Sequence, residues 1–170
     1  MPTHPTTSRQ FSGNAGFKGA EKMMRRLTEE ELRLLKESGY SKKAIELYAH
    51  RINVGVVGAP DIAETHAGPC GDVIRLYLKV DKNDIVKEAK FHYLGCPGSA
   101  ASASAMINLM KGKTIQAAYK ITESDILNEL GGLPKPKLDC PKLAITALRK
   151  ALVRYEKRKA QQKNRACVTR

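Results

Sequence analysis

The stretch that decides the fold is residues 73–94, which read VIRLYLKVDKNDIVKEAKFHYL. Every second residue from Ile74 to Val80 is apolar, and this period of two is typical of a half-buried β-strand. A second alternation runs from Ala89 to Tyr93, after a polar turn at residues 81–84. The pattern predicts two antiparallel strands joined as a hairpin.

Helices are predicted on both sides of this hairpin. Thr28 and Glu31 form a capping-box pattern, which predicts a short helix over residues 29–38. Further helices are expected to begin at Ser41, after Cys96, at Thr114, at Thr122 and at Pro141, and the last of them is expected to be long.

Two segments are predicted to contain neither helix nor strand. Residues 53–69 are rich in Gly, Pro and Ala and are expected to form a loop. Residues 133–137 are expected to be extended, because each proline disfavours the α region in the residue before it. The organisation predicted is an extension over residues 1–40, disordered at first and then carrying one short helix, a domain over 41–160, and a basic tail over 161–170.

Length and composition fit one soluble domain with extensions. The chain has 170 residues, 42% of them hydrophobic, and no apolar run as long as a membrane helix needs. The N-terminus lacks the apolar stretch of a secretory signal, so we expect a cytoplasmic protein without a membrane partner. In a reducing compartment, cysteines more often bind metal or act in catalysis than form disulfides.

The net charge of +13 is concentrated outside the central part of the chain. Residues 1–43 carry +4, residues 44–141 are neutral, and residues 142–170 carry +9. Nucleic-acid-binding domains usually carry a basic patch on the folded face, with aromatic residues in it. Aromatic residues make up only 5% of this chain, so the charge disfavours a nucleic-acid partner. We expect the basic tail to solvate the last helix or to dock on an acidic protein.

Three of the four cysteines lie at the ends of predicted elements, where loops can converge. Cys70 precedes the first strand of the hairpin, Cys96 follows the second, and Cys140 precedes the last helix. A helix start favours the thiolate, which is the form that binds iron or zinc. Spacing alone would favour three small buried side chains, but the glycines beside Cys70 and Cys96 leave room for a bulky ligand. Cys167 lies in the charged tail and is set aside as a bystander.

Asp72 is the candidate oxygen ligand, because it stands two residues after Cys70. It could also be a solvated acid at the end of a strand. Three thiolates and one oxygen suit a cluster that must leave, or a zinc ion in its place. His66 is expected in a loop and in solvent, yet it is the one spare imidazole near a cysteine.

Several separated motifs resemble the IscU/NifU N-terminal family of iron–sulfur scaffold proteins. The resemblance runs from about Ser41 to Lys159. It rests on Asn53-Val54-Gly55, Cys70-Gly71-Asp72, Gly95-Cys96 with the Ser/Ala run that follows, Lys111-Gly112-Lys113 and Asp139-Cys140, all in the order of the family.

The resemblance implies an α+β fold, with a small antiparallel three-stranded sheet, helices packed on it and a long C-terminal helix. The third strand is expected between the first helices and Cys70, near Val54–Val57. It also implies a scaffold rather than an enzyme. In that family a cysteine desulfurase delivers sulfur, a 2Fe–2S cluster forms, and acceptor iron–sulfur apoproteins receive it. By resemblance, Cys70, Cys96 and Cys140 bind the cluster, Cys140 or Cys96 accepts the sulfur, and Asp72 keeps the cluster labile.

Three departures from the family pattern matter. Asp139 replaces the histidine before the last cysteine, and it could be a harder ligand or the N-cap of the last helix. The chaperone-recognition segment of the family appears here as Leu133, Pro134, Lys135, Pro136 and Lys137, which puts binding by a DnaK-type chaperone in doubt. The N-terminal extension and the basic tail suggest a dedicated partner. They leave open an alternative function, that of a scaffold-fold subunit of a larger redox or assembly complex.

Overall fold

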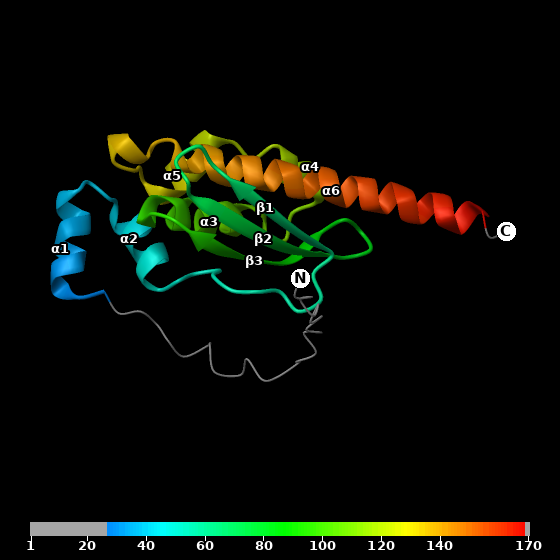
Figure 1. Ribbon diagram of the computed structural model, residues 1–170, viewed down its shortest axis with the longest axis horizontal. Coiled ribbons are helices and arrows are strands. Elements are labelled where there is room, and N and C mark those ends of the chain that lie inside the picture. Colours follow the sequence, from blue (N-terminus) through cyan, green and yellow to red (C-terminus); the bar gives the residue numbers. More distant parts are fainter. Residues whose placement is uncertain (1–26, 169–170) are drawn as a thin grey trace, which may run out of the picture.

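The computed structural model describes the backbone of residues 27–168 and the side chains of residues 27–165, so the disorder predicted for residues 1–20 lies outside the described residues. This part of the chain forms a three-stranded antiparallel sheet and six α-helices, which confirms the predicted α+β fold (Figure 1). The elements are α1 Glu29–Glu37, α2 Lys42–Ala49, β1 Ile62–Ala67, β2 Val73–Val80, β3 Val86–Leu94, α3 Pro97–Met110, α4 Ile115–Tyr119, α5 Glu123–Leu130, the 3-10 turn η2 Lys135–Lys137, and α6 Cys140–Val168.

The predicted hairpin forms the centre and one edge of the sheet. The strand order is β1-β2-β3, and both neighbouring pairs are antiparallel. Ile74 pairs with Tyr93 and Leu76 with Phe91. The side chains of Ile74, Leu76 and Phe91 are fully buried, so the apolar face inferred from the alternation is the face that meets the core.

The third strand lies later in the chain than we expected. β1 falls inside residues 53–69, so the prediction of a loop throughout that segment was wrong. The prediction of a strand near Val54–Val57 was also wrong, because Val54 makes only an isolated bridge to Phe91.

The polar side chains of β1 explain why its pattern was missed. β1 is an edge strand, and α6 runs alongside it. Arg154 of α6 donates to Glu64 Oε2 at 2.9 Å, and Lys150 of α6 contacts His66 Nδ1 at 2.9 Å. The strand is therefore held partly by polar contacts with a helix, and it lacks the apolar alternation that reveals a half-buried strand.

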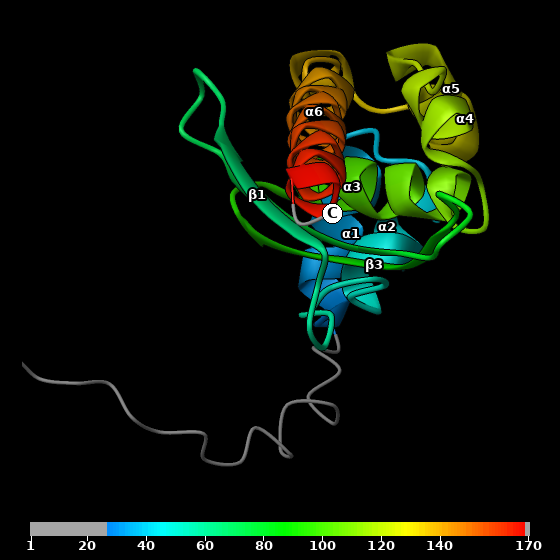
Figure 2. The same ribbon diagram turned by 90° about the vertical axis from the view of Figure 1, so that its right-hand side faces the viewer.

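Helix α3 is the centre of the core. Eleven of its fourteen residues are buried, so the helix is covered on all sides. Its alanine and serine side chains are small enough for α2, α5, α6 and β3 to pack closely against it. Figure 2 shows α3 and α6 side by side on one face of the sheet. The buried stripe predicted for the last helix is confirmed at Leu143, Ala144, Ala147, Leu148, Ala151 and Leu152, whereas Tyr155 is half-buried.

The predicted helix starts are confirmed at four N-caps. Thr28, Ser41, Thr114 and Thr122 each accept a hydrogen bond from the backbone N–H three residues later. These caps fix where the short helices begin and so fix the loops between them.

The segment over residues 133–137 was expected to be extended, and this is only partly right. Pro134 is extended, but residues 135–137 form the turn η2. The N–H of Lys137 donates to the carbonyl oxygen of Pro134 at 2.8 Å and closes this turn. The φ angle that a proline ring imposes is also that of a 3-10 helix, so Pro136 fits the turn.

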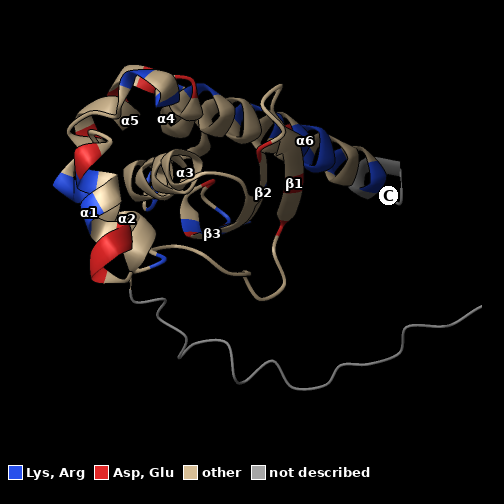
Figure 3. Ribbon diagram, turned by 60° about the vertical axis from the view of Figure 1, so that its left-hand side comes forward, with Lys and Arg blue, Asp and Glu red and all other residues tan. Residues whose placement is uncertain are grey.

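Lys and Arg residues are frequent along the C-terminal half of α6, as the blue segments of its ribbon in Figure 3 show. Several of them have partners on the sheet. Besides the contacts with β1 already described, Arg158 donates to the carbonyl oxygen of Asp61, and Lys159 pairs with the Asp84 carboxylate. Part of the charge of +9 over residues 142–170 therefore attaches α6 to the sheet. No helix within the described residues, α6 included, is both long and apolar enough to span a membrane.

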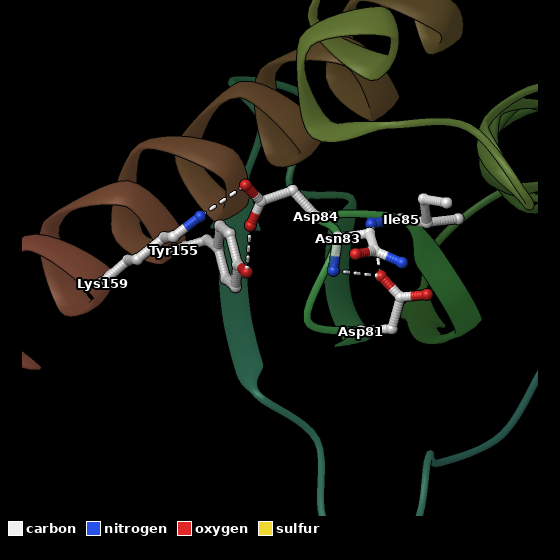
Figure 4. A network of polar contacts seen from close by, with 6 residues as sticks. All are labelled: Asp81, Asn83, Asp84, Ile85, Tyr155 and Lys159. Carbon is white, nitrogen blue, oxygen red and sulfur yellow. Dashed lines mark hydrogen bonds and ion pairs between the residues drawn. The ribbon is translucent and has the colours of Figure 1, made fainter.

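The β2–β3 turn is a further attachment of α6 (Figure 4). The hydroxyl of Tyr155 donates to Asp84 Oδ1 at 2.8 Å, and Lys159 binds the other carboxylate oxygen. Asp81 Oδ1 accepts hydrogen bonds from two backbone N–H groups of the same turn. The turn is therefore stabilised from within and presents Asp84 to the helix.

Candidate metal centre

The three candidate cysteines lie at the ends of three elements and line one cavity of about 550 Å³. Cys70 lies in the loop between β1 and β2 and is exposed. Cys96 is the N-cap of α3 and is half-buried, and Cys140 is the first residue of α6 and is buried. The other three candidate ligands, Asp72, Asp139 and His66, line the same cavity.

Two of the thiols are in direct contact. The sulfur atoms of Cys96 and Cys140 lie 3.7 Å apart. The hydrogen bond from Cys140 lowers the pKa of Cys96 to about 5, although burial acts in the opposite direction. The same bond, together with burial, raises the pKa of Cys140. The two sulfur atoms therefore share one proton, and the pair carries one negative charge.

Two glycines leave room for the candidate ligands, one beside the two thiols and one beside Asp72. A Cβ added at Gly98 would lie 3.0 Å from the sulfur of Cys140 and 3.6 Å from that of Cys96. Gly95 has a φ of +155°, and a Cβ added there would lie 2.5 Å from Cγ of Asp72. A side chain at either position would push a candidate ligand aside.

Asp72 is held in place by groups at the start of α3. Its Oδ2 atom accepts hydrogen bonds from the Ser99 hydroxyl at 2.5 Å and from the Cys96 N–H at 3.3 Å. Burial raises the pKa of the Asp72 carboxyl, but these hydrogen bonds and the charge of Lys137 outweigh it and hold the pKa below its usual value. Asp72 therefore faces the cavity as a carboxylate.

His66 and Asp139 lie on other parts of the cavity wall. His66 was expected in a loop, and this was wrong, because it lies in β1 and is half-buried. Burial and the charge of Lys150 lower the pKa of His66, so the ring is neutral and accepts at Nδ1 from Lys150. Asp139 is exposed at the start of α6. Neither contacts the Cys96–Cys140 pair as closely as Asp72 and Ser99 do.

Ser99 is the main site residue that the sequence did not reveal. It is 1% exposed, and its Oγ lies 3.5 Å from the Cys96 sulfur and 3.6 Å from the Cys140 sulfur. In the sequence it was only one member of a Ser/Ala run. The available signal was its place three residues after the N-cap, since the N-cap and N3 side chains of a helix lie next to each other.

Lys137 and Tyr40 complete the surroundings of the thiols. Lys137 lines the cavity, and its charge favours the ionised forms of Asp72 and Cys140. Burial, followed by the charges of Cys96 and Cys140, raises the pKa of Tyr40 to about 12, so this phenol stays protonated. Tyr40 lies far from the cysteines in the sequence, and no local pattern points to it. Lys137 was singled out only as part of the chaperone-recognition segment and not as a neighbour of the thiols.

The segment that corresponds to the chaperone-recognition motif borders this centre. Leu133 is buried in the core, while Pro136 and Lys137 line the cavity. A partner that bound Leu133, Pro134, Lys135, Pro136 and Lys137 would therefore contact the wall of the candidate metal centre.

The candidate ligands include thiolates, which are the ligands that iron–sulfur clusters take. Among the described residues, no three His, Cys, Asp or Glu side chains converge on one point where an ion could bind them all. A structural zinc ion needs four ligands around one centre. A two-iron cluster spreads its protein ligands over two metal atoms, and three cysteines with one carboxylate supply the thiolates that iron–sulfur clusters take.

The family of the chain follows from a match over most of its length. The family model for the NifU-like N terminal domain matches residues 39–162. The chain therefore belongs to this family, and the resemblance stated from its motifs is confirmed.

Individual relatives agree with this assignment. The chain is 40% identical over 117 residues to the iron-sulfur cluster assembly scaffold protein IscU 1 of Archaeoglobus fulgidus, which covers 68% of this chain and 76% of that protein. It is 39% identical over 124 residues to the scaffold protein IscU of Azotobacter vinelandii, covering 71% of this chain and 96% of that protein.

Solved structures show the same fold. A Fervidobacterium islandicum protein, assigned to iron-sulfur cluster assembly in the SUF system, superposes with a TM-score of 0.56 at 25% identity, covering 66% of this chain and 96% of that chain. The N-terminal part of a NifU-like protein from Brucella abortus superposes with a TM-score of 0.57 over 72% of this chain and 98% of that chain. At 18% identity, this second likeness speaks for the fold alone.

Proposed function

We propose that this chain is an iron–sulfur cluster assembly scaffold. A 2Fe–2S cluster is its cargo, built on the chain and then passed to acceptor iron–sulfur apoproteins. The observation that carries the proposal is that Cys70, Cys96, Cys140 and Asp72 line one cavity, with two of the sulfurs 3.7 Å apart. The names of the relatives support it, since they are called scaffold proteins. A scaffold releases its cargo and is not an enzyme in the turnover sense.

The four proposed ligands have different tasks. The thiolates of Cys70, Cys96 and Cys140 are soft ligands and hold the iron strongly. The Asp72 carboxylate is a harder and weaker ligand for this cargo, so it is the ligand through which the cluster is exchanged. Asp139 and His66 line the same wall and are alternatives for the fourth position. The same set could take zinc in place of the cluster if side chains move toward one centre.

The sulfur comes from a cysteine desulfurase in this proposal. The thiolate of Cys140 or Cys96 attacks the outer sulfur of a persulfide on the desulfurase. The sulfur–sulfur bond of that persulfide breaks, the desulfurase cysteine leaves as a thiolate, and the scaffold cysteine becomes a persulfide. Two electrons from an external donor then reduce the transferred sulfur to sulfide.

Anaerobic reconstitution tests the proposal. The chain is incubated with iron, cysteine, a cysteine desulfurase and a reductant, and visible absorption is recorded. We expect the charge-transfer bands of a cluster, together with about two iron and two sulfide per chain. Cys96→Ala should lose these bands, and Asp72→Ala should keep its cluster longer, because the exchangeable ligand is gone.

The fourth cysteine provides a matched control. Cys167 lies in α6, 27 positions after Cys140 in the sequence. Cys167→Ala should therefore load like the wild type. A wild-type chain that takes up no cluster, even with the desulfurase present, would overturn the proposal.

A further inference from the structure

The Ser99 hydroxyl has more neighbours than it can donate to. It lies in the first turn of α3, is 1% exposed, and has three polar neighbours at the candidate metal centre. Asp72 Oδ2 is 2.5 Å away, the Cys96 sulfur 3.5 Å and the Cys140 sulfur 3.6 Å. A serine hydroxyl carries one proton, so it can donate to only one of these groups at a time.

The Asp72 carboxylate accepts the hydrogen bond from this hydroxyl. A carboxylate oxygen is a stronger acceptor than sulfur, and its contact with Ser99 is the shortest of the three. Asp72 Oδ2 also accepts the Cys96 N–H at 3.3 Å. Both donors bind Oδ2, so this oxygen has to give up a hydrogen bond before it can bind iron.

We propose that Ser99 is a positioning residue that competes with bound iron for the Asp72 carboxylate and so makes Asp72 easy to release. This inference rests on the proposed function, because it concerns how the cluster leaves. When Asp72 turns back to Ser99, the recovered hydrogen bond offsets part of the lost bond to iron. The roles proposed for the four ligands do not by themselves require a serine at position 99.

The cysteine sulfurs make the exchange reversible. A buried hydroxyl without a partner is costly, so Ser99 would oppose loading if Asp72 were its sole acceptor. The Cys96 sulfur is close enough to accept a hydrogen bond from Ser99 after the hydroxyl rotates. Ser99 therefore has an acceptor in either position of Asp72.

The test measures how fast loaded protein loses its cluster. Wild type, Ser99→Ala, Asp72→Ala and the double variant are reconstituted, and the loss of absorption to an excess of iron chelator is followed. We expect Ser99→Ala to lose its cluster about tenfold more slowly, which is the lower end for a hydrogen bond to a charged group. In the Asp72→Ala background, the same substitution should change the rate less than twofold, because Ser99 acts through Asp72.

A second buried serine of α3 serves as the control. Ser102 is 0% exposed, and its Oγ has no hydrogen-bond partner among the described residues. Ser102→Ala should leave the rate of cluster loss unchanged. Ser99→Thr keeps the hydroxyl and should release its cluster within about twofold of the wild type. Thermal unfolding without iron checks that all variants fold.

The outcomes separate the inference from the proposed function. If the wild type loads and Ser99→Ala loses its cluster at the wild-type rate or faster, the inference is wrong and the scaffold proposal stands. An equal slowing by Ser99→Ala in the Asp72→Ala background also overturns it, because the effect then bypasses Asp72. A wild type that never loads overturns both.

Discussion

The two ends of α6 hold their polar groups in opposite ways. At its N-terminal end, Cys140 shares a proton with Cys96, and one hydroxyl of Ser99 serves three neighbours. In its C-terminal half, several basic side chains each bind a separate acceptor in or beside the sheet. Examples are Arg154 with Glu64 and Lys159 with Asp84.

This difference matches two tasks. The N-terminal end of α6 exchanges ligands, and its C-terminal half attaches the helix to the sheet. A group with a second acceptor within reach avoids the cost of an unpaired buried polar group when it leaves the first, and a cargo that arrives and leaves needs this. Groups with separate partners hold the helix in one position against β1 and the β2–β3 turn. The attached half therefore fixes where Cys140 stands, while the other end stays able to exchange ligands.

The largest effect is expected from a substitution at the N-terminal end of α6, where the polar groups share hydrogen-bond partners. In Gly95→Ala, the added Cβ would lie 2.5 Å from Asp72 Cγ, and φ at this position is +155°. Asp72 must then move away from the Cys96 N–H and from Ser99. Unlike Ser99→Ala, this shift also removes the hydrogen bond that holds the Cys96 N–H. Disturbed groups beside metal ligands typically cost about 10–100-fold in metal affinity, so we expect a loss of this size in iron titrations.

Gly71→Ala is the matched control for backbone strain. Gly71 has a φ of +85° and lies beside the same motif, but a Cβ added there meets nothing within 4 Å. Because of backbone strain, Gly71→Ala should lower the free energy of unfolding by about 1–3 kcal/mol. The iron affinity should change little. Equal loss of iron affinity in both variants would show that strain, and not the position of Asp72, is responsible.

The next largest effect is expected at the other end of α6, where Asp84 binds two side chains of the helix. Asp84→Asn keeps a residue that tolerates the φ of +60° found here but removes the charge that binds Lys159 and Tyr155. Because the Asp84 side chain is 24% exposed, we expect a moderate loss of about 1–2 kcal/mol in urea unfolding. Cluster loading should be unchanged, and a clear loss of loading would contradict the separation of the two ends.

The same attachment predicts how stability depends on pH. Lys159 and Tyr155 hold the pKa of Asp84 below its usual value, so this stabilisation is complete above about pH 5 and is lost as the pH falls through the folded pKa. Burial and Asp84 raise the pKa of Tyr155 to about 12. The contribution of Tyr155 to stability is complete below about pH 9. It is lost as the pH rises through the pKa that Tyr155 has in the folded protein. Melting temperatures measured across this range should fall more steeply at both extremes in the wild type than in Asp84→Asn.

The sequence predicted the parts of the fold that local chemistry decides. The alternation from Ile74 to Val80 and the N-caps such as Thr28 depend on neighbouring residues, and both were confirmed. β1 was missed because its polar residues Glu64 and His66 are satisfied by α6, which is distant in the sequence. A pattern within one segment cannot show a partner about 90 residues away.

The candidate centre was predictable in a similar, partial way. Cys70, Cys96 and Cys140 were found because each stands at the end of an element, and ends of elements can meet. Ser99 was not found, because its importance comes from Asp72 and Cys140, which reach it from two other parts of the chain. Spacing reveals neighbours within one turn of helix, while contacts between turns, loops and other helices require the folded structure.

The smallest effect concerns one ion pair on the surface of the attached half. Arg154 is 62% exposed, and its pair with Glu64 spans 2.9 Å. Arg154→Gln should lower the unfolding free energy by about 0.2–1 kcal/mol, with most of this difference lost in 1 M salt, where charges are screened within about 3 Å. Lys157→Gln removes a charge from the same helix at a position for which the described residues show no ion pair, so it should change stability less. If both variants lost the same amount, the general charge of α6 would matter, and the attachment to β1 would not depend on this pair.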